Sequence, residues 1–90
     1  MARLRRTFVI VNSLGLHARA AAQLVQAANR FRAEVLVSKD DQEVNGKSIM
    51  GVLTLAAAKG TTIVVITEGD DAEAAMAALA KLVEGGFGET

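Results

Sequence analysis

The feature that most constrains this chain is the alternation of two hydrophobic periods within only 90 residues. Short segments with the period of a strand are interleaved with segments whose apolar residues lie three and four apart. The predicted strands are residues 4–11, 33–38, 43–44 and 61–67. The predicted helices are residues 18–30, 49–56 and 72–83. The order β-α-β-β-α-β-α leaves room for one modest core, so we expect a single α+β domain over residues 1–90.

Individual residues support these elements. Phe8 and Ile10 fall on one side of the first strand. Four residues of the first helix form one apolar stripe: Ala21, Leu24, Val25 and Ala28. The third helix has a D-x-x-E capping signal from Asp70 to Glu73 at its start. Gly60 either ends the second helix or belongs to a turn.

Two sheet plans fit this order. The connections are mostly local, which favours a four-stranded antiparallel sheet covered on one face by three helices. The ferredoxin-like β-α-β-β-α-β plan is a close competitor. Periodicity alone does not choose between them.

Composition narrows the classes of function. Ten basic and ten acidic residues cancel, so there is no general electrostatic case for nucleic acid or an anionic membrane. The small basic cluster of Arg3, Arg5 and Arg6 is interpreted as a solvated strand end. There is no cysteine and only one histidine, which argues against a metal site. The apolar run at residues 8–11 is too short for a membrane span or a signal peptide, so a cytoplasmic protein is expected.

The single histidine, His17, lies where a glycine-containing loop meets the alanine-rich first helix. The positive end of the helix dipole favours the neutral ring, whose free nitrogen can act as a nucleophile. Once a phosphoryl group is attached, the same N–H groups favour the anion, and Arg19 can add a charge-assisted contact. Taken alone, the position is also compatible with a surface or capping histidine.

Two sequence blocks resemble a known family. "GLHARAA" at residues 15–21 resembles the active-site signature of HPr, the histidine phosphocarrier of the bacterial phosphoenolpyruvate-dependent phosphotransferase system. "NGKSIMGVLTLAAAKG" at residues 45–60 is similar to the serine-site region of the same family. The resemblance covers essentially the whole chain and favours the HPr-like open-faced sandwich.

The resemblance implies a sugar-transport phosphoprotein that carries a phosphoryl group, not an enzyme in the narrow sense. His17 would accept the group from enzyme I and pass it to IIA proteins or domains, with Arg19 stabilising the phosphate and no cofactor or metal. The family commonly has proline after the arginine, whereas this chain has Ala20. Alanine is a good helix former, so we expect the site to survive.

Ser48 has two interpretations. It is a suitable N-cap for the second helix, which by itself explains its position. In some HPr proteins the matching serine is a regulatory phosphorylation site for HPr kinase/phosphorylase, and the resemblance extends this role to Ser48. It also implies partner contacts through Leu16, Ile49, Met50 and Leu53, although Leu16 also suits the core and Met50 suits core filling.

Three alternatives stay open. One is the nitrogen-type phosphocarrier, NPr, and another is a small acylphosphatase-like hydrolase. The third is a regulatory HPr homologue, which the presence of His17 disfavours. A monomer is expected because one face must dock on both donor and acceptor.

Overall fold

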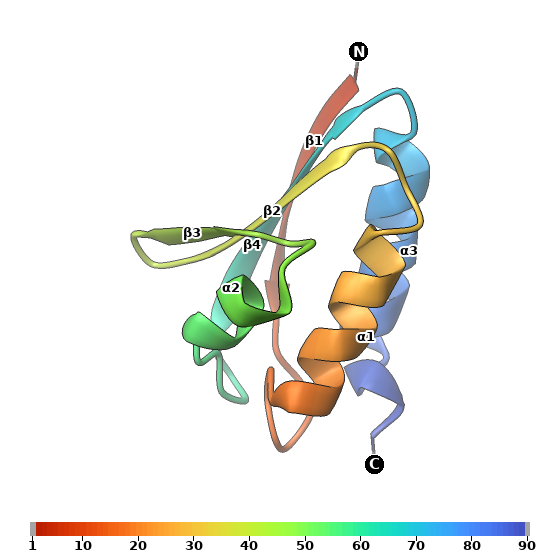
Figure 1. Ribbon diagram of the computed structural model, residues 1–90. Helices are drawn as coiled ribbons and strands as arrows, with labels where there is room; N and C mark the ends of the chain where they lie inside the picture. The colour runs from red at the N-terminus through yellow and green to blue at the C-terminus, as the bar shows by residue number, and fades with distance from the viewer. Residues whose placement is uncertain (1, 90) are drawn as a thin grey trace.

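The computed structural model describes residues 2–89 as one sheet with helices packed against it (Figure 1). The elements are β1 (Ala2–Val9), α1 (Ala18–Ala28), β2 (Glu34–Lys39), β3 (Gln42–Asn45), α2 (Ile49–Thr54), β4 (Thr62–Gly69), α3 (Ala72–Glu84) and a short 3-10 turn, η1 (Gly86–Gly88). This is the predicted order β-α-β-β-α-β-α, and the predicted open-faced sandwich is confirmed.

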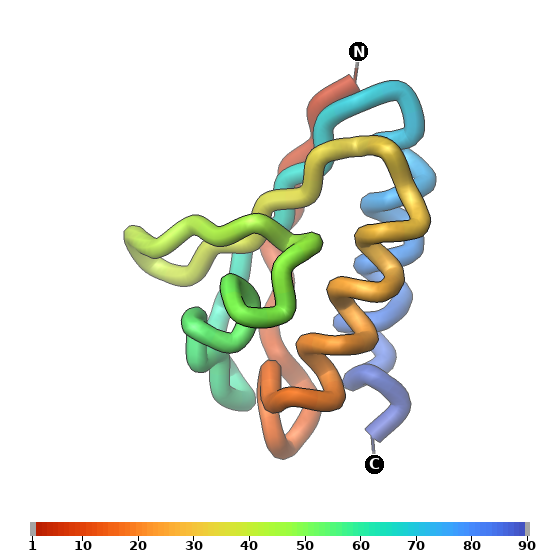
Figure 2. The backbone as a smooth tube through the Cα atoms, in the orientation of Figure 1, coloured from red at the N-terminus to blue at the C-terminus, as the bar shows by residue number. Residues whose placement is uncertain are grey.

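The sheet has the strand order β1-β4-β2-β3, and every neighbouring pair is antiparallel. The central strands are therefore β4 and β2, while β1 and β3 form the two edges. In the ferredoxin-like plan the first and third strands are instead central neighbours, so that alternative is wrong. Figure 2 shows α1 and α3 running side by side along the same face of the sheet.

The core lies between that face and the helices. Alternate residues of β4 are buried, including Ile63 and Val65, because successive side chains of a strand point to opposite faces. The predicted stripe of α1 is also buried as expected: Ala21, Leu24, Val25 and Ala28. The small alanines of this stripe let α1 approach the sheet closely, while Leu24 fills the space between them.

The first strand begins and ends two residues earlier than predicted. Phe8 and Ile10 are buried as expected, but β1 ends at Val9. Beyond the end of β1, Ile10 still forms a backbone hydrogen bond to the segment just before β4: its N–H donates to the Thr61 carbonyl at 2.9 Å. Val11 is 49% exposed and leads into the loop before α1. The chain thus leaves the sheet two residues sooner than its apolar run suggests.

The second helix is also shorter than predicted. It ends at Thr54, and Ala56 has a left-handed φ of 49°, which a continuing helix does not permit. Gly60, with a φ of 87°, lies in the turn before β4. Of the two interpretations of Gly60, the turn is therefore the one confirmed.

The predicted capping box at the start of α3 is wrong. The N-cap residue is Asp71 rather than Asp70, and its side chain makes no capping bond. Its carboxylate instead accepts hydrogen bonds from the N–H groups of Arg32 at 2.9 Å and Ala33 at 2.8 Å. These bonds, that of Arg32 first, lower the pKa of Asp71. The carboxylate therefore ties α3 to the chain just before β2, a long-range contact that no local pattern indicates.

Candidate functional site

His17 is the N-cap residue of α1, as the sequence predicts. Its backbone is extended, with φ of −72° and ψ of 180°, and its carbonyl accepts the first helical bond from Ala21 at 2.8 Å. Its ring Nδ1 accepts from the Arg19 N–H at 3.3 Å. Ala20 is fully buried in the first turn, and α1 still begins at Ala18. The imidazole therefore lies against the N–H groups that an anion at this helix end would use.

The loop before His17 is held by a glycine that no other residue replaces easily. Gly15 has a φ of +65°, and a Cβ built there would lie 2.3 Å from the Ala57 carbonyl oxygen. This close approach lets the next N–H, that of Leu16, donate to the same oxygen at 2.8 Å. Glycine is required at this position both for the backbone conformation and for the space. The loop after α2 thereby fixes the backbone position from which His17 begins α1.

The other ring nitrogen of His17 faces a carboxylate from the far end of the chain. Nε2 is hydrogen-bonded to Oε2 of Glu89, and Oε1 of Glu89 accepts from the Asn12 side-chain amide at 2.8 Å. The side chains of His17 and Glu89 are 27% and 16% exposed. The bond from Asn12, followed by that from His17, lowers the pKa of Glu89. Glu89 is therefore ionised at neutral pH and faces Nε2 as a hydrogen-bond acceptor.

A left-handed turn after α3 brings Glu89 to this position. Gly86, Phe87 and Gly88 have φ values of 63°, 57° and 76°. Phe87 is the unusual member, because a bulky residue rarely adopts this conformation, but its ring is only 4% exposed in the core. Figure 1 shows this C-terminal turn beside the start of α1. Burial of the Phe87 ring thus anchors the segment that carries Glu89.

Sequence reasoning missed both Asn12 and Glu89. Asn12 is 4% exposed, and besides holding Glu89 its amide donates to the Gly15 carbonyl at 2.8 Å. One sequence signal was available for the tail: an isolated aromatic between two glycines, directly after a helix stop. No local pattern, however, links that tail to a loop 72 residues earlier.

This arrangement suits a nucleophilic histidine. With Nε2 protonated and held by a carboxylate, the lone pair of the ring lies on Nδ1, at the helix N-terminus. Arg19 has an exposed side chain and lines the same open pocket as His17 and Glu89. Leu14, 68% exposed, lies at the rim of that pocket and was not predicted. The predicted pair of His17 and Arg19 is thus brought together at one surface.

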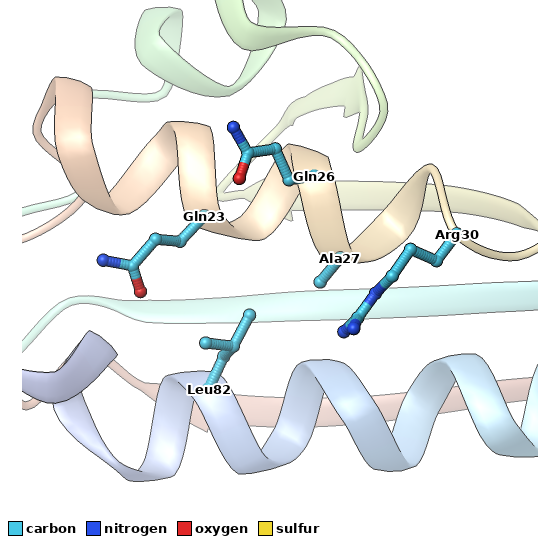
Figure 3. Close-up of a pocket in the computed structure, with 5 residues that line it drawn as sticks. All are labelled: Gln23, Gln26, Ala27, Arg30 and Leu82. Carbon is cyan, nitrogen blue, oxygen red and sulfur yellow. The ribbon is translucent and has the colours of Figure 1, made fainter.

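A second shallow pocket lies between α1 and α3 (Figure 3). Gln23 and Arg30 reach from α1 toward α3, and Leu82 reaches back from α3. Gln23 also lines the His17 pocket, so the two hollows adjoin. The residues that line this second pocket include no histidine and no carboxylate, and therefore no candidate nucleophile or acid–base pair.

Ser48 is an N-cap, but it lies away from His17. Its Oγ accepts from the Gly51 N–H at 3.1 Å. The neighbouring Lys47 carbonyl accepts from the Asn29 amide at 3.3 Å, and Asn29 is the C-cap of α1. His17 and Ser48 therefore lie toward opposite ends of α1, whose 11 residues span about 16 Å. The structure does not bring the two predicted phosphate sites together.

The four predicted partner contacts differ in exposure: two are exposed, one is partly buried and one is buried. Ile49 and Met50 are 43% and 73% exposed, so the core-filling interpretation of Met50 is wrong. Leu53 is partly buried and packs against the core. Leu16 is only 4% exposed, so it belongs to the core and not to a docking surface. Its side chain is drawn inward because Gly15 turns the backbone against residue 57.

Two further observations concern residues 2–89. No three His, Cys, Asp or Glu side chains in this range lie close enough to hold a metal ion. No helix in the same range has the length and apolar character needed to cross a membrane.

Comparison with known proteins decides the family. The profile described as "PTS HPr component phosphorylation site" matches residues 4–85. This chain belongs to the HPr family. HPr proteins are phosphocarriers of the phosphotransferase system, and the resemblance predicted from the two sequence blocks is confirmed.

Individual HPr relatives match nearly end to end. The phosphocarrier protein HPr of Neisseria meningitidis serogroup A is 54% identical over 86 residues, covering 96% of this chain and 97% of the relative. The crystal structure of HPr-C-His from Thermoanaerobacter tengcongensis superposes with a TM-score of 0.93 at 45% identity, covering 97% and 98% of the two chains. A structure described as an HPr dimer from the same organism has a TM-score of 0.78 at 46% identity, covering 91% and 94%.

Proposed function

We propose that this HPr protein carries a phosphoryl group on Nδ1 of His17, received from enzyme I and delivered to IIA proteins or domains. The observation that carries the proposal is the position of the ring. Nε2 is hydrogen-bonded to Glu89, which leaves the Nδ1 lone pair as the nucleophile at the helix N-terminus. The protein is regenerated at each cycle and acts as a carrier.

The same geometry accommodates the product. Nδ1 attacks phosphorus, the bond between phosphorus and the donor breaks, and its electron pair leaves with the donor. Because the Nδ1 lone pair is then used, the Arg19 N–H is released from the ring and can donate to a phosphoryl oxygen. The exposed guanidinium of Arg19 adds a charge-assisted contact from the same pocket.

In our proposal, donor and acceptor proteins dock on a surface that extends from the His17 pocket to the exposed apolar residues of α2. Ile49 and Met50 present apolar area on α2, and Leu14 does so beside His17. Leu53 contributes at the margin of this surface. Because one surface serves both partners, we propose that the protein acts as a monomer, and we place it in the cytoplasm. The Thermoanaerobacter structure described as an HPr dimer makes the oligomeric state worth measuring.

Regulatory phosphorylation of Ser48 by an HPr kinase/phosphorylase is the second part of the proposal. A phosphate at a helix N-terminus is electrostatically tolerated, so the fold need not change. Since Ser48 lies toward the other end of α1 from His17, such a phosphate acts on the docking surface that includes Ile49 and Met50. Direct contact with His17 is not required.

The test is to incubate the protein with enzyme I and phosphoenolpyruvate and to read its intact mass before and after acid treatment. We expect one acid-labile phosphate, absent in His17→Ala and retained in Ser48→Ala as the matched control. No phosphate from carbohydrate-branch enzyme I, but transfer from the nitrogen-branch enzyme, would assign the protein to the NPr branch. Turnover of an acyl phosphate without a stable phosphoprotein would overturn the carrier proposal in favour of a hydrolase.

A further inference from the structure

The carboxylate of Glu89 is fixed as part of the site rather than free in solvent. One oxygen accepts from the Asn12 amide at 2.8 Å and the other is hydrogen-bonded to Nε2 of His17. Asn12 is itself 4% exposed and bonded to the Gly15 carbonyl at 2.8 Å. The buried ring of Phe87 holds the backbone two residues earlier. The hydrogen-bonded series Asn12–Glu89–His17 is therefore anchored in the folded protein at Asn12 and at His17.

The charge of the ring changes during the proposed reaction. Before transfer the neutral imidazole carries its proton on Nε2. When Nδ1 gives its lone pair to phosphorus, Nε2 keeps that proton and the ring becomes a cation. The positive end of the α1 dipole and Arg19 both disfavour a cation here. Glu89 is the one carboxylate among the residues that line this pocket, so it opposes both effects.

We propose that Glu89 is a positioning residue for phosphoryl transfer, which fixes the Nε2–H form of His17 and balances the positive charge that the ring gains. The inference rests on the proposed function of His17. The carboxylate acts more strongly on the cationic ring than on the neutral ring, so it stabilises the transition state and the phosphorylated protein more than the starting state. Asn12 serves this role indirectly, by holding the carboxylate in place.

The contact itself is tested first, on the unphosphorylated protein. In protein labelled with ¹⁵N on histidine, we expect a slowly exchanging Nε2–H proton that is lost in Glu89→Ala. The matched control is Glu84→Gln, which removes a carboxylate from the exposed end of α3, where it contacts Arg6 at 3.4 Å. A signal identical in wild type and Glu89→Ala would overturn the inference, because Glu89 would then not hold the ring.

The effect on transfer is tested by phosphorylation kinetics with enzyme I. We expect Glu89→Gln, which keeps the shape but removes the charge, to lower kcat by roughly tenfold with little change in KM. The equilibrium level of phosphoprotein should fall by a similar factor, and Glu84→Gln should match wild type. An unchanged kcat, or an effect confined to KM, would overturn the inference. If wild type itself is not phosphorylated by any donor, the proposed function fails instead, and the two failures are thus distinguished.

Discussion

The N-termini of α1 and α2 have similar backbones, but the N-cap residue is histidine in α1 and serine in α2. His17 and Ser48 both have extended backbones, both accept a backbone N–H through the side chain, and both follow a glycine by two positions. Serine is a preferred N-cap, and its bond to Gly51 accounts for its position. Histidine is not a preferred N-cap, and its bond to the Arg19 N–H is longer, at 3.3 Å against 3.1 Å.

The difference separates structural from chemical reasons for a residue. Ser48 needs nothing beyond its own helix to explain it. His17 is held by Glu89, which lies 72 residues away, and its second nitrogen points to a helix end suited to anions. A weak cap supported by a distant carboxylate is a better indication of a functional residue than a good cap.

The largest loss of stability is expected at Gly15 and Gly46, the glycines that lie two positions before the N-cap residues His17 and Ser48. Gly15→Ala places a Cβ against the Ala57 carbonyl in a left-handed conformation, so we expect a loss of more than about 3 kcal/mol in the free energy of unfolding. Gly46→Ala meets a methyl group of Val35 at 2.5 Å, without that backbone strain, and should cost about 1 to 3 kcal/mol. Urea unfolding of both variants is the measurement. Equal losses in the two variants would mean that the left-handed backbone of Gly15 adds no strain beyond the steric clash.

A smaller effect is expected at Ser48. Ser48→Ala removes the bond to the Gly51 N–H and should lower stability by about 1 kcal/mol. Ser48→Asp keeps a capping oxygen and adds charge at the favourable end of the dipole, so its stability should stay close to that of wild type. If the docking proposal holds, Ser48→Asp should nevertheless raise the KM for enzyme I, whereas Ser48→Ala should not. Thermal unfolding and transfer kinetics separate the two properties, and a KM that follows stability would contradict the proposal.

The smallest effect is the pH dependence of the Glu89 contact. Because the pKa of Glu89 is lowered in the folded protein, chiefly by Asn12, its stabilisation is fully present above the ordinary value of 4.5. It is lost as the pH falls through the lower folded value. The difference in Tm between wild type and Glu89→Gln should therefore shrink as the pH falls through that lower value. Asp71, whose pKa is also lowered, contributes equally to both proteins and cancels. A difference in Tm that does not depend on pH would show that the charge of Glu89 is irrelevant to stability.

The sequence by itself determined the elements, their order and the position of His17, the central residue of the candidate site, at a helix start. Hydrophobic period is a local property, and it identified the buried stripe of α1, the strand around Ile63 and the helix start at His17. It also paired His17 with Arg19, because residues two apart at a helix N-terminus share one set of free N–H groups. The local signal was least accurate at element ends: residues 10–11 lie beyond the observed end of β1, and Ala56 lies beyond the observed end of α2.

Only the tertiary structure decided the strand order, the burial of Leu16 and the partners of His17. Each depends on groups far apart in the sequence: the Ala57 carbonyl against Gly15, and Glu89 against His17. The position of Glu89 follows from the insertion of the Phe87 ring into the core, which offsets the cost of a left-handed backbone. Such contacts come from packing between elements rather than from the conformational preference of any one segment. For that reason local sequence patterns do not predict them.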